Sequence, residues 1–326
     1  MADRIIQSET LQAIANAIRG GQSQSAQDKI EVENFATTAG ETLEQFASVV
    51  DGTATSVKIP NTVQKVGKYA FSHSEIVSVD LNEATELDEY AFSNSKLTSI
   101  DLSKVTKLGA HCLSKTKLVN VVIPNTVLEQ NAGDNLFFQC DALKTYSLPE
   151  NWTKIPTYMF GETAIENLVI PSNIEEIGSS AFYHCMGLIN ITIPETVKTI
   201  GNQAFSRCEN VETITVENGC TTLANSAFNY IPKCELINLP STITSIGTYA
   251  FSSMKSTGVI NCGFAENAVA GAPWGAPAGV TINYGVTSGA KGGNRATSTV
   301  VVTKEMAEEY ARNHPIEEGE DKQEVK

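Results

Sequence analysis

An aromatic position that recurs every 21 to 25 residues constrains this 326-residue chain more than any other feature of its sequence. Self-similarity at a fixed period of about 20 to 50 residues is typical of repeat architectures, so the spacing predicts ten stacked structural units. We assign the recurring position to Phe71, Phe92, Leu113, Phe138, Phe160, Phe182, Phe205, Phe228, Phe251 and Trp274.

An extended segment follows each aromatic position and has the pattern apolar-x-x-apolar-x-apolar. Leu188, Ile191 and Ile193 give one example. The alternation predicts a short strand with its apolar side chains inside and the intervening side chains outside. Pro194 and Pro240 are among the prolines that we expect to end these strands, because proline donates no hydrogen bond to a ladder.

These patterns predict a β-rich α/β solenoid, a leucine-rich-repeat array of about ten units of 21–25 residues with small helical N- and C-terminal flanks. One unit cannot fold alone, because burying its few apolar side chains does not offset the entropy of ordering its backbone. The glycines that precede the Ala-Phe pairs suit a tight turn where a side chain would clash: Gly67, Gly178, Gly201 and Gly247.

The repeats divide the chain into four predicted segments. We expect a helical N-terminal anchor or cap over 1–52, the solenoid over 53–285, a Gly/Ser-rich linker over 286–298 and a strand, a helix and an acidic tail over 299–326. Gly/Ser-rich sequences behave as flexible linkers, which is the reason for the third boundary.

Both flanks carry short helical or extended patterns. Leu11, Ile14 and Ile18 lie at the spacing of one helix face, and this face is expected either to anchor the chain to another subunit or to cap the first repeat. In the C-terminal flank, Val300–Val302 is predicted to be a strand and Thr303–Asn313 a helix.

Two units depart from the pattern. The segment between Pro124 and Phe138 is longer and lacks the Ile-Gly pair, which is consistent either with a neutral loop or with a bulge that has a role. The unit of Trp274 contains several prolines and is predicted to be a terminal cap, because the end of a solenoid must cover its apolar face.

The charge of the chain restricts its partners. The net charge is −14, whereas binding to nucleic acid or to anionic lipid requires clusters of lysine and arginine. We therefore expect no nucleic acid and no membrane insertion. A protein, a glycan or another subunit stays open as a partner.

The sequence shows none of the residue patterns that indicate catalysis or metal binding. None of the seven cysteines has C-x-x-C spacing, and we expect them to be small apolar fillers, with Cys185 and Cys208 in one column that Cys140 joins. No histidine has a partner at metal-ligand spacing, and no nucleophile elbow or phosphate loop is present. We expect no enzyme activity, no cofactor and no metal.

The outward positions of the strands form two polar columns that we take as the candidate partner-binding face. The candidate residues are Ser78, Asp80, Ser99, Asp101, Asn120, Thr145, Asn167, Asn190, Thr192, Thr213 and Thr215, and the second column continues through Asn238 and Asn261. Solenoids commonly bind along such a surface. The columns contain no tryptophan, tyrosine or arginine, so a solvent surface without a partner is the alternative. Trp152, Tyr158, Tyr183 and Trp274 are then rival contact residues.

The repeat Ile-Gly-x-x-Ala-Phe, followed by a strand and a proline, resembles the BspA-like (Treponema-type) leucine-rich repeat. The resemblance covers residues 56–284 and appears nearly verbatim in "IPETVKTIGNQAFSRCENVETIT" from Ile193. It implies a curved parallel-sheet solenoid used for adhesion or for protein and glycan binding.

The first 50 residues resemble the start of tail-associated structural proteins of phages that infect gut bacteria, including an "IDGT"-like step at Val50–Thr53. This resemblance implies a non-enzymatic virion protein on the tail or a surface appendage. It would contact other virion proteins through its N-terminal region, form an oligomer on the particle and bind a host-surface protein or glycan.

The sequence leaves two alternatives to a host-binding virion protein. No apolar run of signal-peptide length follows Met1, which favours synthesis in the host cytoplasm and assembly into a virion. The alternatives are a BspA-like adhesin on a bacterial cell surface and a purely structural virion decoration without receptor binding.

Overall fold

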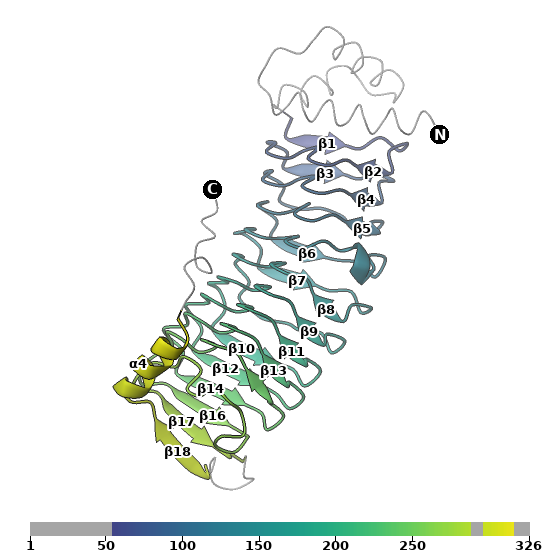
Figure 1. Cartoon of the computed structure of the whole chain (residues 1–326). Coiled ribbons are helices and arrows are strands. Elements are labelled where there is room, and N and C mark those ends of the chain that lie inside the picture. Colours follow the sequence, from purple (N-terminus) through teal and green to yellow (C-terminus); the bar gives the residue numbers. More distant parts are fainter. Residues whose placement is uncertain (1–53, 288–295, 316–326) are drawn as a thin grey trace. The chain divides into compact units, whose positions relative to one another are not determined.

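The structure, a computed structural model, describes residues 54–287 and 296–315. The chain forms two compact units, residues 1–167 and 168–326, and each is described by itself. Both consist of β-rich coils stacked one on the next, so the predicted leucine-rich-repeat solenoid is confirmed (Figure 1). The proposed anchor residues Leu11, Ile14 and Ile18 and the acidic tail lie outside the described residues.

The strands of the first unit form two rows, one on each side of the stacked coils. The longer strands carry the predicted leucine-rich-repeat pattern, and the shorter ones precede the aromatic position. The longer strands are β1 (Ser56–Lys58), β3 (Ser78–Asp80), β6 (Asn120–Val122) and β7 (Thr145–Ser147). The shorter ones are β2 (Lys65–Val66), β4 (Glu86–Leu87), β5 (Lys107–Leu108) and β8 (Lys154–Ile155).

The second unit has the same two rows, and the strands of its main row are longer than those of the first unit. Its main sheet has the order β10-β12-β14-β16-β17-β18, parallel except for the last pair. These strands are β10 (Asn190–Ile193), β12 (Thr213–Val216), β14 (Leu236–Leu239), β16 (Val259–Cys262), β17 (Thr281–Tyr284) and β18 (Ser298–Val301). The other row contains β9 (Glu176–Ile177), β11 (Thr199–Ile200), β13 (Thr222–Leu223) and β15 (Ser245–Ile246).

Prolines end the strands as expected. β10 ends at Ile193 directly before Pro194, and β14 ends at Leu239 directly before Pro240. The backbone then turns, because the Pro194 carbonyl accepts a hydrogen bond from the Val197 N–H at 3.1 Å. Each proline therefore stops the ladder and starts the tight turn toward the next short strand.

Stacked aromatic rings fill the core of each unit. In the second unit, the ring of Phe205 stacks on Phe182 at 5.2 Å and on Phe228 at 5.4 Å, with interplanar angles of 4° and 9°. The Phe205 N–H also donates to the Ala227 carbonyl of the next coil at 2.8 Å. Ring stacking and backbone hydrogen bonds thus join neighbouring coils at the same place.

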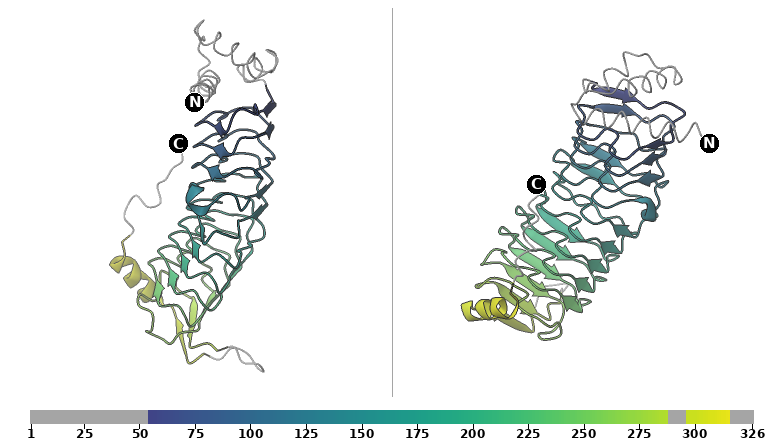
Figure 2. Two further views of the ribbon diagram at one scale, coloured as in Figure 1. Left: turned by 90° about the vertical axis from the view of Figure 1, so that its right-hand side faces the viewer. Right: turned by 45° about the horizontal axis from the view of Figure 1, so that its top comes forward.

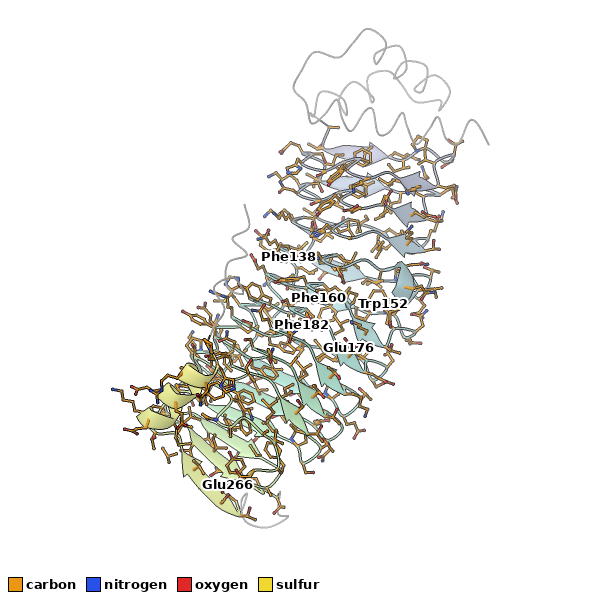
Figure 3. All side chains as sticks on the ribbon, in the orientation of Figure 1. Phe138, Trp152, Phe160, Glu176, Phe182 and Glu266 are labelled. Carbon is orange, nitrogen blue, oxygen red and sulfur yellow. The ribbon has the colours of Figure 1, made fainter. Side chains whose placement is uncertain are left out.

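The assignment of Phe138 to the aromatic column is wrong. Phe137 occupies the column, where it is fully buried, stacks on Phe160 at 5.8 Å and donates its N–H to the Met159 carbonyl at 2.9 Å. Phe138 lies beside the column and contacts Tyr158 edge to face (Figure 3). The insertion before this pair hides the register, because either phenylalanine satisfies the spacing.

The irregular segment before Phe137 packs against the following coil. It contains the short 3-10 helix η1 (Glu129–Asn131), and the Glu129 carboxylate accepts hydrogen bonds from the Thr153 hydroxyl at 3.0 Å and the Lys154 N–H at 3.1 Å. Trp152 is fully buried and donates its indole N–H to the Val127 carbonyl at 2.8 Å (Figure 3). Trp152 is therefore a core residue, and its prediction as a surface contact is wrong.

Two left-handed residues flank the column position in each of the nine coils up to that of Phe251, whereas in the last coil Trp274 itself is left-handed, with a φ of 52°. In the coil of Phe205, Gln203 and Arg207 have φ values of 55° and 61°, and the same pair recurs from Tyr69 and His73 onward. Non-glycine residues rarely adopt this conformation, since their Cβ approaches the following carbonyl oxygen. The hydrogen bonds between coils hold the turn in place, for example that from the Arg207 N–H to the Asn229 carbonyl at 2.8 Å.

The predicted lack of room for a side chain is confirmed at two of the four glycines, and its cause is the neighbouring coil. A Cβ on Gly201 would lie 2.8 Å from the backbone of Gly178, and one on Gly247 would lie 2.4 Å from the Asn225 nitrogen. Both distances are shorter than real Cβ contacts allow. The neighbouring coil therefore passes too close for a side chain at these positions.

The C-terminal strand and helix are confirmed. β18 pairs antiparallel with β17, and α4 (Lys304–Asn313) begins after Thr303, whose hydroxyl accepts a hydrogen bond from the Met306 N–H at 3.2 Å. Figure 2 shows α4 alongside the coils of the second unit. Its buried Tyr310 packs edge to face on Tyr249, and its hydroxyl oxygen accepts a hydrogen bond from the Tyr249 N–H at 3.2 Å.

The coil of Trp274 closes the aromatic column. Trp274 is fully buried and meets the rings of Phe251 and Phe264 edge to face at 6.2 and 6.0 Å. Its indole N–H donates to the Ala270 carbonyl at 2.9 Å. Trp274 is therefore part of the core, and its prediction as a rival surface contact is wrong.

Candidate binding surface on the strand face

The outward strand positions form columns in each unit, as their spacing predicts. Parallel pairing aligns Ser78 with Ser99 in the first unit and Thr192 with Thr215 in the second. Asn120 is aligned with Thr145, and Asn190 with Thr213. Asn167 is exposed at the last position of the first unit. The candidate residues of each unit therefore share one face, and whether this face binds a partner stays a prediction.

The strand face of the first unit is charged. Asp80 and Asp101 line a groove of about 360 Å³ together with Asn82, Ser103 and Lys104. The Ser103 N–H donates to the Asp101 carboxylate at 2.9 Å, and the hydrogen bonds from Ser103 lower the pKa of Asp101. Both aspartates are exposed and available to a partner with positive charge.

The strand face of the second unit carries a row of asparagine amides, which we call the amide ladder: Asn238, Asn261 and Asn283 on β14, β16 and β17. The Asn261 amide N–H donates to the Asn238 oxygen at 3.0 Å, and the Asn283 amide N–H donates to the Asn261 oxygen at 2.9 Å. Thr299 of β18 donates its hydroxyl to Asn283 at 2.9 Å. Each amide is thereby fixed by its neighbours.

A groove of about 650 Å³, lined by polar and apolar residues alike, runs beside the amide ladder. Residues of the strands and of the turns that follow them line it: Glu195, Thr215, Val216, Glu217, Asn218, Asn238, Leu239, Pro240, Ser241, Asn261, Gly263, Val286 and Thr287. The lining contains carboxylates, amides and hydroxyls, and neither a basic nor an aromatic side chain. Its volume lies in the range of about 300 to 1,000 Å³ that is usual for ligand pockets.

Sequence reasoning missed part of this groove. Asn238 and Asn261 were recognised as members of the second column but not as candidate site residues. Asn283 and Thr299 were not assigned to the column at all, although Asn283 follows Asn261 by 22 residues, close to the repeat period. Glu195 and Glu217 lie just after strands, where the pattern of the repeat gives no signal of function.

A second row of aromatic side chains lies at the turns of the first unit. Tyr90 stacks on Tyr69 at 4.8 Å and on His111 at 4.6 Å, with interplanar angles of 9° and 6°. All three residues have left-handed backbone and are half-buried. Partial burial lowers the pKa of His111, so the neutral ring is favoured in the stack.

The cysteines are buried free thiols, as expected. Cys140, Cys185 and Cys208 occupy the same position, three residues after Phe137, Phe182 and Phe205, and the Cys208 thiol donates to the Phe182 carbonyl at 3.2 Å. Burial raises the pKa of Cys140 and of Cys220 to about 11. Because the thiolate is the reactive form, these thiols are poor nucleophiles.

Residues 54–287 and 296–315 contain no group of three His, Cys, Asp or Glu side chains that could hold a metal ion. Within the same residues, His73 pairs with the Ser72 hydroxyl at 2.9 Å, and His314 stacks on Tyr310 at 4.2 Å. No helix in the described part of the chain has the length and apolarity that a bilayer crossing requires.

The stacked coils and the polar strand face define a leucine-rich-repeat protein. The family model described as "BspA type Leucine rich repeat region (6 copies)" matches residues 50–162 and 130–258, which together make up more than half of the chain. The chain therefore belongs to the BspA type leucine-rich-repeat family. A comparison with curated proteins gives no match.

Solved leucine-rich-repeat proteins of bacteria resemble the chain at low identity. One from Eubacterium ventriosum is 15% identical, with 67% of this chain and 71% of that chain covered and a TM-score of 0.46. One from Bacteroides ovatus is 16% identical, with coverages of 66% and 81% and a TM-score of 0.37. The leucine-rich-repeat protein of T. pallidum is 21% identical, with coverages of 50% and 78% and a TM-score of 0.41.

Proposed function

We propose that the chain is a non-enzymatic binding module that presents its strand face to a partner at an exposed biological surface. The observation that carries this proposal is the strand face itself, with its polar columns in register and its grooves. Solenoids use such extended surfaces for recognition. The raised pKa values of the buried thiols fit a role without covalent chemistry.

Binding to the strand face is tested with a labelled full-length chain on bacterial cells. Replacing both Asp80 and Asp101 by lysine reverses the charge of the first unit's face and is expected to weaken attachment about tenfold or more. Glu86→Lys with Glu89→Lys is the control, because it makes the same charge change on the row of short strands. Equal binding by both double variants would show that the contact lies elsewhere than on this face. If the unaltered chain attaches to no cell, the result would contradict a binding function.

The N-terminal sequence supports a virion as the surface that displays this module. Its resemblance to phage tail-associated proteins implies that residues around Leu11, Ile14 and Ile18 attach the chain to other virion proteins, with several copies on one particle. Deleting residues 1–30 is then expected to abolish incorporation into particles while the coils stay folded. Incorporation at an unchanged level would contradict the anchor.

Membership in the BspA type family supports a bacterial cell surface as the second candidate. Mass spectrometry separates the two locations. A virion protein is expected at stoichiometric copy number in purified particles, whereas an adhesin is expected in the cell envelope of bacteria that carry the gene. A virion decoration without a receptor would be present in particles and would leave host attachment unchanged when the strand face is altered.

A further inference from the structure

We infer that the amide ladder and its groove in the second unit form a binding site for a neutral oligosaccharide. The inference rests on the proposed binding function and names the ligand class of one site. It depends on three observations: a groove of about 650 Å³, a row of mutually hydrogen-bonded amides along it, and a lining without basic or aromatic side chains.

The amides are positioned before any ligand arrives. Asn261 uses one N–H on Asn238 and one oxygen lone pair on Asn283. An asparagine amide has two N–H groups and two lone pairs, so one donor and one acceptor remain on Asn261. The hydrogen bonds to Asn238 and Asn283 fix the orientation of this donor and this acceptor, which reduces the entropy lost when a ligand binds.

The spacing of the rungs repeats with the strands. Parallel strands lie about 4.8 Å apart, so donor and acceptor groups recur along the groove at that interval. A hydroxyl group both donates and accepts a hydrogen bond, and a chain of sugar residues presents many hydroxyls in succession. Such a chain can therefore pair with Asn238 and Asn261 at once, and with the hydroxyls of Thr215 and Ser241 in the same groove.

The charges of the groove restrict the ligand further. Glu195 and Glu217 are exposed carboxylates at its edge, and no lysine or arginine lines it. Carboxylates accept hydrogen bonds from hydroxyls but repel anions, which excludes sulfated or phosphorylated sugars. The groove contains no aromatic ring on which a sugar or an aromatic ligand could stack, so hydrogen bonding has to carry the affinity.

The first unit shows that these features do not follow from the repeat alone. The same strand column there carries Lys58 and Asp80, which form an ion pair at 3.7 Å, and then Asp101 and the exposed Val122. A charged column binds neutral hydroxyls with less selectivity, because it also attracts ions and basic peptides. The neutral ladder is a property of the second unit.

The test is a titration of the full-length chain with neutral gluco-, galacto- and manno-oligosaccharides, followed by NMR of the side-chain amide groups. Binding of at least one of them is expected to shift the Asn238 and Asn261 amide signals, with a Kd of about 1 mM because stacking is absent. Replacing Asn261 by valine, which fits a strand, is expected to weaken binding about tenfold.

Asn202→Ala is the control, because Asn202 is an exposed amide that follows β11 in the row of short strands and does not line the groove. It is expected to change binding by less than about twofold. Both variants are checked by thermal unfolding, and Ser241→Ala, in the turn after β14, tests the groove without touching the ladder.

Three results would overturn the inference. The first is the absence of amide shifts with every neutral oligosaccharide, and the second is equal binding by the Asn261 and Asn202 variants. The third is tighter binding of anionic oligosaccharides or of a basic peptide, which would assign the groove to another ligand class. If the chain attaches to cells while any of these results holds, the proposed binding function stands and only the ligand is wrong.

Discussion

The strand faces of the two units differ in chemistry although one repeat builds both. In the first unit, the longer strands have three residues each and display Asp80 and Asp101. In the second, five parallel strands and one antiparallel strand form a continuous sheet that displays a neutral amide ladder. The comparison shows that stacking fixes the inward positions of the repeat, whereas the outward column is free to vary from coil to coil.

The largest expected difference between the units lies in the aromatic column. Phe205 has a ring stacked on each face, whereas Phe92 has Phe71 on one face and the aliphatic Leu113 in the next coil. Phe205→Ala is therefore expected to cost about 3–5 kcal/mol of unfolding free energy, and Phe92→Ala about 1 kcal/mol less. Urea denaturation measures both, and a larger loss at Phe92 would contradict this order.

The next largest effect is expected when an amide on one face is replaced by an acid and an acid on the other face by an amide. Asn261→Asp removes the donor to Asn238 and places a carboxylate beside its oxygen, with an expected loss of about 1–3 kcal/mol at pH 7. Asp101→Asn keeps an oxygen for the Ser103 N–H and is expected to change stability by less than about 0.5 kcal/mol. Thermal unfolding at pH 7 measures the stability of both variants. Equal losses would contradict the expectation that the amide ladder stabilises the second unit.

The hydroxyls of one tyrosine in each unit provide a smaller test. The Tyr310 hydroxyl accepts a hydrogen bond from the Tyr249 N–H, so Tyr310→Phe is expected to cost about 1 kcal/mol and to speed hydrogen exchange in α4. Tyr90→Phe preserves the stack with Tyr69 and His111 and is expected to be nearly neutral. A neutral Tyr310→Phe variant would indicate that ring packing alone holds the helix.

The pH dependence of the first unit gives the smallest expected effect. Burial lowers the pKa of His111, so as pH falls through about 6.5 the unfolded chain takes up a proton before the folded one. The stabilisation present above that pH is therefore lost below it. His111→Tyr retains a ring against Tyr90. The melting temperature of this variant minus that of the unaltered chain is expected to increase by a few degrees as the pH falls from 7.5 to 5. A constant difference would contradict the burial of the neutral ring.

Much of the fold follows from the sequence because the repeat makes local signals coincide. Strand, proline and turn recur at one spacing, so the outward columns align once the strands are taken as parallel. The helix predicted over 303–313 forms as α4 one residue later, because the Thr303 hydroxyl accepts the Met306 N–H that the helix leaves without a partner. The acid at Asp80 and Asp101 was likewise visible as two consecutive members of one column.

What sequence reasoning missed depends on contacts across coils. The choice between Phe137 and Phe138 rests on the hydrogen bond from Phe137 to Met159, which no local pattern reveals. Tryptophan is common at surface contacts, but Trp152 is buried, and its indole N–H donates to the Val127 carbonyl of the preceding coil. The groove needs turn residues such as Glu195 and Glu217 beside the amides, an arrangement that exists only after the coils stack.

Because each coil adds one amide to the ladder, the length of the groove can change during evolution by one coil at a time. Asn238 and Asn261 lie 23 residues apart, one coil of the second unit. An in-frame duplication of such a coil by recombination between its similar gene segments would insert one rung and lengthen the row by about 4.8 Å. A deletion would shorten it by the same amount. The length of the groove can thus evolve by copying a coil, without any new fold or new side chain.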